Sequence, residues 1–375
     1  MKLNKLISIL TLFFTSSSQA SVEIRLQEWG YLPDSFEEEF HRYAQTRGID
    51  ANVVIIEPLI TDFESIYKTI RTNSADVVIP TSYFYKAHHQ PLFKLLLPID
   101  FERLMNYSEL KDFMKNTEYD KQADRNYSVP LLYGMFSLAY DSKKIKEPDS
   151  WSVLLQKENK DTFTEFCDQF EPLLLSTLLS HQRSPALFSS GAILEDKQLL
   201  TVLEEKLTKR LINTRGFWFN QVNSCASLQK QHLATTWGIE LVKCNRENKQ
   251  SWKIASVKEG AIYGLDAISI VRTVAKDPSK LTAAYVLVDF LLSSSLQKHF
   301  TTPTFRGSNK NSMPELNVEE MNILPQGNFI DFDERLLIPA LPANIKNRYK
   351  RMVNQAIVTS GKSGLANKCT WDLNN

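Results

Sequence analysis

Residues 22–31 read Val-Glu-Ile-Arg-Leu-Gln-Glu-Trp-Gly-Tyr, an apolar and charged run that ends in two aromatic residues. The run predicts a strand over Val22–Gln27. Residues 76–80 read Asp-Val-Val-Ile-Pro, and a short continuous apolar run of this kind is typical of a buried parallel strand. The aromatic pair Tyr83-Phe84 follows this second run, as Trp29 and Tyr31 follow the first.

Helical patterns lie between these strands. Asp34-Ser35 followed by Glu38 is a capping-box pattern, and it predicts the start of a helix that ends at Gly48. Residues 52–57 predict the next strand, and residues 62–72 predict a second helix with apolar residues at helical spacing. Alternating strands and helices indicate a mostly parallel sheet flanked by helices.

Three aromatic residues come directly after strands of this predicted sheet. Trp29 and Tyr31 follow the first strand and Tyr83 follows the third, so all three should lie at one mouth beyond the carboxyl ends of the strands. Indole and phenol rings attract ammonium groups by roughly 0.5–2 kcal/mol each. The alternative is that these rings are ordinary core, because large aromatic residues are usually buried.

The first twenty residues predict an export signal. Lys2 and Lys5 give a positive start, residues 6–14 form an apolar run, and Ser18-Gln19-Ala20 is a small-residue cleavage site. The apolar run is shorter than the roughly 20 residues that a membrane-spanning helix needs. We therefore expect a chain that starts near Ser21, works outside the cytoplasm and does not insert into the membrane.

The bulk composition excludes one class of function and predicts two lobes. The chain of 375 residues carries 44 Lys and Arg against 43 Asp and Glu. Balanced charge argues against a nucleic-acid binder held by bulk electrostatics. A chain this long exceeds what one hydrophobic core usually serves. The charged stretch 203–210 predicts the solvated face of a helix.

Four cysteines remain in the exported chain: Cys167, Cys225, Cys244 and Cys369. An even number outside the cytoplasm favours disulfides, and four cysteines allow three pairings. Their separations do not match paired zinc ligands. We favour a bond between Cys225 and Cys244, which leaves Cys167 for Cys369.

The second half of the chain predicts a hinge. Residues 128–141 predict a strand that passes from one lobe to the other, residues 265–271 a return strand, and residues 281–300 an amphipathic helix. A chain that crosses between lobes makes a hinge, and a hinge makes a cleft that can close on a ligand. We expect an N-terminal lobe of residues 21–133 and 267–308, and a C-terminal lobe of residues 134–266 and 309–375.

The sequence contains no strong catalytic or metal-binding motif. Residues 356–363 nearly match a phosphate-cradling loop, but they follow a helical stretch rather than a strand. The neighbours His88 and His89 would point apart on a helix or strand, so exposed histidines are favoured over a metal site. No nucleophile elbow, His-Glu-x-x-His helix or dinucleotide loop occurs. We expect a protein that is not an enzyme and carries no metal or cofactor.

Asp168 and Glu171 form a candidate cation site. Spaced three apart, they lie on one face of a helix and repel each other unless a cation is near. At a helix start the backbone dipole also favours their ionised form. The alternative is a pair of exposed first-turn acids, because helix starts attract acids in any case.

Five segments, taken in order, resemble one known family. They are 28–31, 76–84, 128–134, 236–238 and 258–266, and they read Glu-Trp-Gly-Tyr, Asp-Val-Val-Ile-Pro-Thr-Ser-Tyr-Phe, Ser-Val-Pro-Leu-Leu-Tyr-Gly, Thr-Trp-Gly and Lys-Glu-Gly-Ala-Ile-Tyr-Gly-Leu-Asp. The chain resembles the periplasmic polyamine-binding proteins of bacteria, the spermidine/putrescine-binding family of ABC importers, over nearly its whole exported length. The resemblance implies an α/β, two-lobed periplasmic binding protein fold, in which each lobe is a mixed, mostly parallel sheet flanked by helices. It also implies a cleft between the lobes that binds a linear polyamine.

The resemblance also implies roles for single residues. Trp29, Tyr31, Tyr83 and Trp237 match aromatic positions that enclose the methylene chain of the ligand. Phe305 matches a position where the family often has tyrosine.

Four acids match polar positions of the family. Asp168 and Glu171 match the pair at one end of the ligand, and Asp266 matches the acid that holds amines deeper in the cleft. Asp333 matches a polar position that closes the far end.

The chain departs from the family pattern at several positions. Gly264 stands where a tryptophan is frequent, and Tyr263 is the residue that we expect to compensate. Phe84 replaces the second tyrosine of a pair. The family includes a branch that resembles the norspermidine sensor, so the expected partner is either an inner-membrane ABC permease or a signalling receptor, with spermidine, norspermidine or putrescine as the ligand.

The sequence is also compatible with two other functions. A secreted hydrolase would need a buried nucleophile beside a base. A binder of another cation such as ferric iron would favour paired tyrosines, and Phe84 interrupts that pair.

Overall fold

A computed structural model of the chain describes residues 21–60, 62–86, 92–115, 118–167, 169–218, 224–312, 316–328, 330–366 and 369. The predicted export signal, the His88-His89 pair and Asp168 lie outside these residues.

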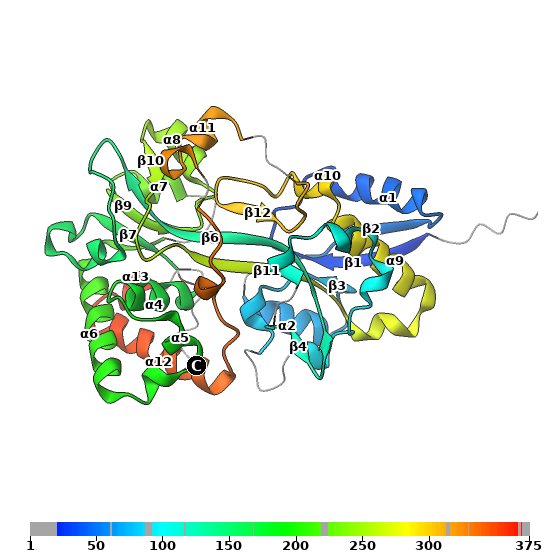
Figure 1. The fold of residues 1–375 in the computed structure, drawn as a ribbon, viewed down its shortest axis with the longest axis horizontal. Helices are drawn as coiled ribbons and strands as arrows, with labels where there is room; N and C mark the ends of the chain where they lie inside the picture. The colour runs from blue at the N-terminus through cyan, green and yellow to red at the C-terminus, as the bar shows by residue number, and fades with distance from the viewer. Residues whose placement is uncertain are drawn as a thin grey trace, which may run out of the picture.

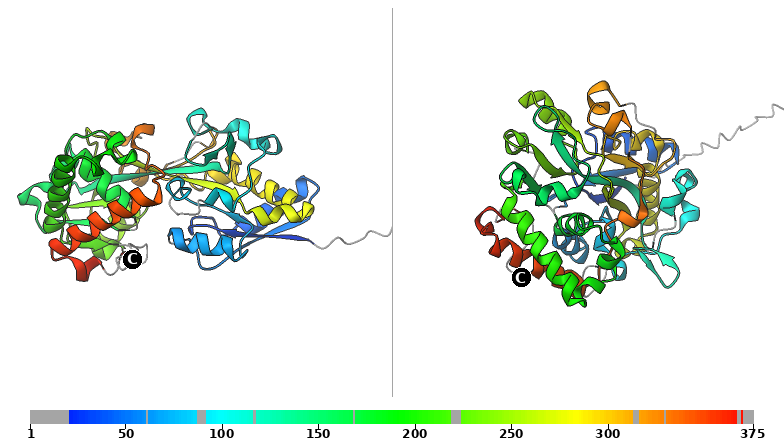
Figure 2. Two further views of the ribbon diagram at one scale, coloured as in Figure 1. Left: turned by 90° about the horizontal axis from the view of Figure 1, so that it is seen from below. Right: turned by 60° about the vertical axis from the view of Figure 1, so that its left-hand side comes forward.

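The described chain forms two lobes joined by long strands (Figures 1 and 2). One sheet runs through both lobes in the order β2-β1-β3-β11-β6-β9-β7-β8, with β10 and β12 also paired to β6. Its strands are β1 (Val22–Gln27), β2 (Ala51–Ile55), β3 (Val77–Val78), β6 (Val129–Asp141), β7 (Phe163–Phe166), β8 (Gly216–Trp218), β9 (Leu233–Thr236), β10 (Trp252–Ile254), β11 (Ile262–Ile270) and β12 (Phe305–Gly307). A separate pair is β4 (Lys121–Gln122) with β5 (Arg125–Asn126).

Helices cover the sheet in both lobes. In the N-terminal lobe α1 and α9 pack together on one face, and Figure 1 shows α2 on the other. The α-helices are α1 (Phe36–Thr46), α2 (Phe63–Arg71), α3 (Asp112–Lys115), α4 (Phe170–Leu179), α5 (Pro185–Ser189), α6 (Lys197–Asn213), α7 (Ser224–Leu228), α8 (Leu241–Asn248), α9 (Pro278–Leu291), α10 (Ser294–Gln297), α11 (Val318–Met321), α12 (Ala343–Thr359) and α13 (Ser363–Ala366).

The strands β6 and β11 connect the lobes. The first half of β6 pairs with β11 in antiparallel register, and the second half pairs with β9 and β10 of the C-terminal lobe. The end of β11 pairs with β3 of the N-terminal lobe. Because β1 pairs with both β2 and β3 in parallel, the carboxyl ends of these three strands meet at one edge. The mixed, two-lobed α/β fold expected from the sequence is confirmed.

Several local predictions need correction. The expected capping box at α1 does not form, because Ser35 hydrogen-bonds the Glu39 side chain instead of the helix backbone. The box forms at α2, where Asp62 and Ser65 cap each other. The single helix expected over 281–300 is two helices, α9 and α10, because Ser293 ends the first and caps the second.

The charged stretch 203–210 belongs to α6 but is not wholly solvated. The side chain of Arg210 is buried and forms an ion pair with Glu165 of β7, at 2.6 Å between Nε and Oε1. Ser176 and Thr177 accept further hydrogen bonds from the guanidinium, and Thr235 donates one to the carboxylate. The prediction of a solvated helix face was therefore wrong at Arg210, because its burial depends on Glu165 of another strand, which the local sequence pattern does not reveal.

Both disulfides pair as expected: Cys225 with Cys244, and Cys167 with Cys369. Within the described residues, no helix is long and apolar enough to cross a membrane.

Candidate functional site

The loop after β1 is shaped by Glu28. Its carboxylate is buried and accepts hydrogen bonds from the backbone N–H groups of Gly30 at 2.6 Å and Tyr31 at 3.1 Å. Burial raises the pKa of Glu28, and the backbone bonds oppose that shift. Gly30 has a φ of 87°, a left-handed conformation that glycine adopts without strain. Glu28 therefore fixes the turn that carries the two aromatic side chains.

The indole of Trp29 is held at the edge of the N-terminal lobe. Its Nε1 donates a hydrogen bond to the Ile79 carbonyl at 2.8 Å, just after β3. Its ring lies 6.1 Å from that of Phe84, which is buried and stands edge-on to Tyr83 at 5.2 Å. The aromatic residues that follow β1 and β3 thus lie together, as the parallel register of the strands requires.

Asp266 lies where β11 changes partner. The pairing of β11 with β6 shifts register between Asp266 and Ala267, and Asp266 forms an isolated bridge with Thr81. Its side chain is partly buried, and no ion pair with a described residue balances it. Burial raises the pKa of Asp266 to about 7, although a hydrogen bond with the Thr81 side chain opposes that shift.

Tyr31 is coupled to this carboxyl group. Its hydroxyl is buried and has no hydrogen-bond partner among the described residues. Burial raises the pKa of Tyr31 well above its usual value, and the charges of Asp266 and Glu28 raise it further. A donor in a ligand could satisfy both this hydroxyl and the Asp266 carboxylate.

Trp237 supplies a ring from the opposite lobe. It follows β9, and it packs over Gly264 of β11 so closely that a Cβ there would lie 2.9 Å from the indole. Gly264 pairs with Gly134 on the neighbouring strand. Phe305 packs over Gly134 in the same way, since a Cβ added at Gly134 would lie only 2.5 Å from the Phe305 ring. The ring of Trp237 lies 6.3 Å from that of Phe305. The two glycines therefore form a flat platform on which these rings lie.

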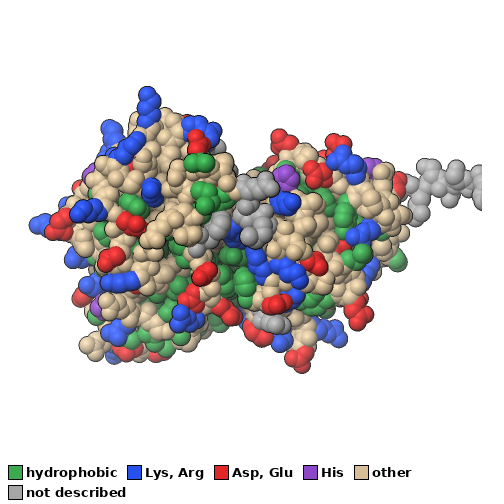
Figure 3. All heavy atoms as spheres, turned by 45° about the horizontal axis from the view of Figure 1, so that its top comes forward, with side chains coloured by type: hydrophobic (Ala, Val, Ile, Leu, Met, Phe, Trp, Pro, Cys, Tyr) green, Lys and Arg blue, Asp and Glu red, His purple; other side chains and the backbone are tan. Residues whose placement is uncertain are grey.

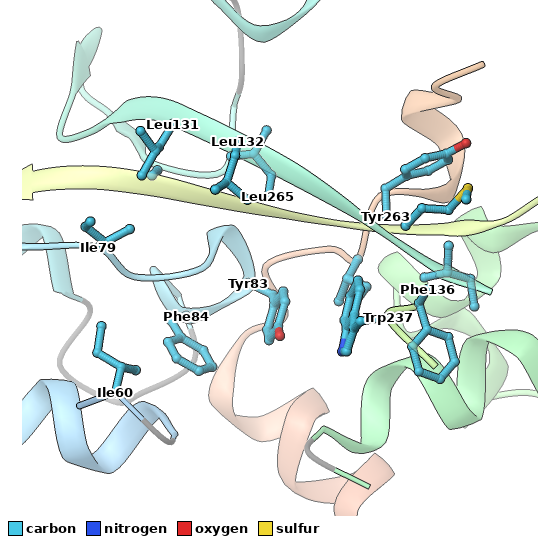
Figure 4. Packing of buried hydrophobic residues seen from close by; sticks show 14 of the residues in the cluster. Ile60, Ile79, Tyr83, Phe84, Leu131, Leu132, Phe136, Trp237, Tyr263 and Leu265 are labelled. Carbon is cyan, nitrogen blue, oxygen red and sulfur yellow. The ribbon is translucent and has the colours of Figure 1, made fainter. Parts of the chain in front are cut away.

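The rings of both lobes share one face of the crossing strands. Figure 4 shows Tyr83 and Trp237 next to one another beneath β6 and β11, with Phe84 and Phe136 to either side. Trp237 is edge-on to Phe136 at 5.3 Å. In the space-filling view the molecule narrows to a waist between its lobes, and hydrophobic side chains lie there (Figure 3). We use the name interlobe site for the residues on this face of β6 and β11 and at the adjoining ends of β1 and β3: Trp29, Tyr31, Tyr83, Trp237, Phe305 and Asp266.

Glu171 lies at the start of α4, in a part of the C-terminal lobe that contacts β11. Its side chain is buried, so it is not an exposed first-turn acid. The Oε1 atom is 3.0 Å from the Lys346 ammonium of α12, and Oε2 has no hydrogen-bond partner among the described residues. The sequence predicted a cation near this acid, and for Glu171 that cation is Lys346 of the same chain.

Tyr263 and Asp333 lie elsewhere. Tyr263 alternates with Gly264 along β11, so its ring points to the other face of the strands, where its hydroxyl donates to the Asp331 carbonyl at 2.7 Å. It is buried there against Tyr133 and Phe332. Asp333 caps the next short helix and pairs with the exposed Arg335. The structure does not bring these two residues to the interlobe site. The ring that lies over Gly264 belongs to Trp237 and not to Tyr263.

Sequence reasoning missed Lys346, Thr81, Phe136 and the positioning role of Glu28. The role of Glu28 could have been predicted from its position directly before the Trp-Gly-Tyr turn, because carboxylates in turns often accept hydrogen bonds from nearby backbone N–H groups. Nothing in the sequence links Lys346 to Glu171, which lies far away along the chain. Within the described residues, no group of three His, Cys, Asp or Glu side chains could hold a metal ion.

The sequence matches no known family model and no curated protein. Its fold, however, is similar to those of solved binding proteins. The spermidine/putrescine ABC transporter substrate-binding protein PotD from Streptococcus pneumoniae matches with a TM-score of 0.65 and 19% identity, over 91% of this chain and 100% of that one. The TpPotD lipoprotein of Treponema pallidum matches with a TM-score of 0.61 and 15% identity, over 89% and 99%.

The ligands of these solved structures differ: the PotD structure holds calcium and HEPES, and a third structure holds glucopine. The PBP MotA from A. tumefaciens B6, in complex with glucopine, matches with a TM-score of 0.60 and 12% identity, over 91% of this chain and 99% of that one. At these identities the likeness establishes the fold. The ligand has to be inferred from the side chains of this chain.

Proposed function

We propose that this protein is a solute-binding protein that captures a linear amine of the polyamine class between its lobes. The observation that carries the proposal is the Asp266 carboxyl group, which no described cation pairs and which lies in an aromatic site beside the unpartnered hydroxyl of Tyr31. A carboxylate attracts an ammonium group, and ring faces accept both ammonium and methylene groups. The solved structures with a similar fold are of substrate-binding proteins, which supports binding rather than catalysis.

The expected contacts are sufficient for useful affinity. A micromolar complex needs about −8 kcal/mol. Charge-assisted hydrogen bonds contribute about 1.5–3 kcal/mol each, and ring contacts about 0.5–2 kcal/mol each. Three ring contacts and two charge-assisted hydrogen bonds, each at the upper end of these ranges, reach this sum after the lowest association cost of about 4 kcal/mol.

In this proposal the loaded protein works in the periplasm and meets an inner-membrane partner. The predicted export signal supports that location, and the partner is an ABC permease or a signalling receptor of the norspermidine-sensor kind. Pull-down of inner-membrane proteins with and without spermidine separates the two: a permease favours import, and a receptor favours sensing. The hinge would lie near residues 133 and 267, where β6 and β11 pass between the lobes.

The competing functions find less support. Phe84 is buried against Trp29 and Phe63, so the Tyr83-Phe84 pair offers only one phenol to a ferric ion. The comparisons bring no support for a hydrolase. A ligand screen by thermal shift across diamines, triamines, amino acids and anions tests the proposal directly, because a ligand of the folded state raises its melting temperature.

The Trp237→Ala variant should bind a polyamine more weakly. One ring contact of about 1–2 kcal/mol corresponds to roughly a five- to thirtyfold loss of affinity. Titration calorimetry with spermidine measures the loss. Trp218→Phe is the control, because that ring packs against Phe166 within the C-terminal lobe. Equal affinity of Trp237→Ala and the wild type would remove Trp237 from the binding site.

A further inference from the structure

The ammonium group of Lys346 lies between Glu171 and the ring of Phe84, which contacts Trp29 and Tyr83 of the interlobe site. Lys346 lies in the first turn of α12, and its Nζ is 3.0 Å from Oε1 of Glu171. The same Nζ lies 5.6 Å from the ring centroid of Phe84 and 5.8 Å from that of Phe170. Only 15% of the Lys346 side chain and 1% of the Glu171 side chain are exposed.

These surroundings are the ones that a bound alkylamine would need. They combine a buried carboxylate with two aromatic rings, and the lysine side chain is itself a primary ammonium on a four-carbon stem. Phe84 belongs to the N-terminal lobe, whereas Glu171, Phe170 and Lys346 belong to helices of the C-terminal lobe. The lysine therefore bridges the two lobes as a ligand between them would.

A purely structural ion pair in this protein is built differently. The buried pair Arg210–Glu165 is surrounded by hydroxyl groups that hydrogen-bond both partners. At Glu171, by contrast, Oε2 is buried with no hydrogen-bond partner among the described residues. The Glu171 carboxylate therefore keeps an acceptor oxygen that the described chain leaves unsatisfied, whereas both oxygens of Glu165 have partners.

We propose that Lys346 determines specificity: its ammonium holds one amine subsite, so that the site selects short amines over triamines. This inference rests on the proposed function. With Glu171 neutralised by Lys346, the carboxylate left for a ligand among the described site residues is Asp266. A further ammonium on a longer ligand would lose water beside Lys346 and meet a like charge there, and it would find the negative charge of Glu171 already neutralised.

The test compares three probes: butylamine, 1,4-diaminobutane and spermidine. Wild-type protein should bind 1,4-diaminobutane at least as tightly as spermidine. Lys346→Met removes the ammonium and keeps an apolar stem, so affinity for spermidine should rise tenfold or more, and affinity for butylamine less than threefold. Lys346→Arg should keep the wild-type order. Lys350→Met, one turn further along α12, is the matched control, because no ion pair joins Lys350 to a described residue.

The outcomes separate this inference from the proposed function. Tighter binding of spermidine than of 1,4-diaminobutane by the wild type, or an unchanged affinity ratio in Lys346→Met, overturns the role of Lys346 and leaves amine binding intact. Failure of every protein to bind any of the three probes overturns amine binding itself. If Lys346→Met does not fold, Lys346→Gln replaces it, with the same expected change in the ratio, and circular dichroism verifies the fold.

Discussion

Asp266→Asn should weaken binding of a polyamine by roughly ten- to a hundredfold, because a charge-assisted hydrogen bond contributes about 1.5–3 kcal/mol. The amide keeps the shape of the carboxyl group and removes its charge. Titration calorimetry at pH 8 measures the loss. Asp124→Asn, an exposed acid between β4 and β5, is the control and should bind as the wild type does. Wild-type affinity in Asp266→Asn would remove Asp266 from the site.

The same carboxyl group predicts the pH dependence of binding. An ammonium ligand needs the ionised form, and the pKa of Asp266 in the free protein is about 7. Protons therefore compete with the ligand below pH 7, and affinity should fall roughly tenfold from pH 8 to pH 6. The Asn variant should show almost no change over this range. A flat profile in the wild type would contradict the raised pKa.

The free energy of unfolding of the unliganded protein should depend on pH in the opposite sense to ligand affinity, and it should fall as the pH rises. Because the pKa of Asp266 is higher in the folded state than in the unfolded chain, ionisation costs the folded state free energy. The contribution of this group to the free energy of unfolding is greatest below about pH 4 and is lost as the pH rises to 7. At pH 8 the Asn variant should therefore melt at a higher temperature than the wild type, which excludes misfolding as the cause of lost binding.

Arg210→Ala should have the largest effect on stability, a loss of about 3–5 kcal/mol from the free energy of unfolding. The substitution leaves the Glu165 carboxylate buried without its cation, since both side chains are only 1% exposed. Urea unfolding followed by circular dichroism measures the loss.

The control for this prediction is Arg246→Ala. Arg246 pairs with Glu319 at the surface, with side chains 69% and 58% exposed, and exposed pairs of this kind contribute little to stability because water screens them. Equal losses in the two variants would contradict the assigned difference between buried and exposed pairs.

The arrangement of the N-terminal lobe could be predicted because it depends on local patterns. Apolar runs located β1 and β3, and parallel pairing then required that Trp29 and Tyr83 lie at one edge. The alternation of side chains along a strand also separates two of the predicted site residues. Tyr263 and Asp266 are three positions apart on one strand, and an odd spacing puts side chains on opposite faces.

The parts that could not be predicted depend on contacts between distant segments. The absence of a side chain at Gly264 is explained by Trp237, which follows another strand and lies directly over this glycine. Lys346 reaches Glu171 because α12 packs beside α4, and helix packing of this kind leaves no pattern in either segment alone. The raised pKa of Asp266 likewise arises from burial where several elements meet.

The bond between Cys167 and Cys369 has a practical consequence for anyone who prepares this protein. Cys167 directly follows β7 and lies four residues before Glu171, so the disulfide links Cys369 to the short segment that leads into α4 and this acid. Expression in a reducing bacterial cytosol would yield free thiols and release that tether. Samples for ligand titration should therefore be produced by secretion or oxidative refolding, with the thiol content measured before any affinity is recorded.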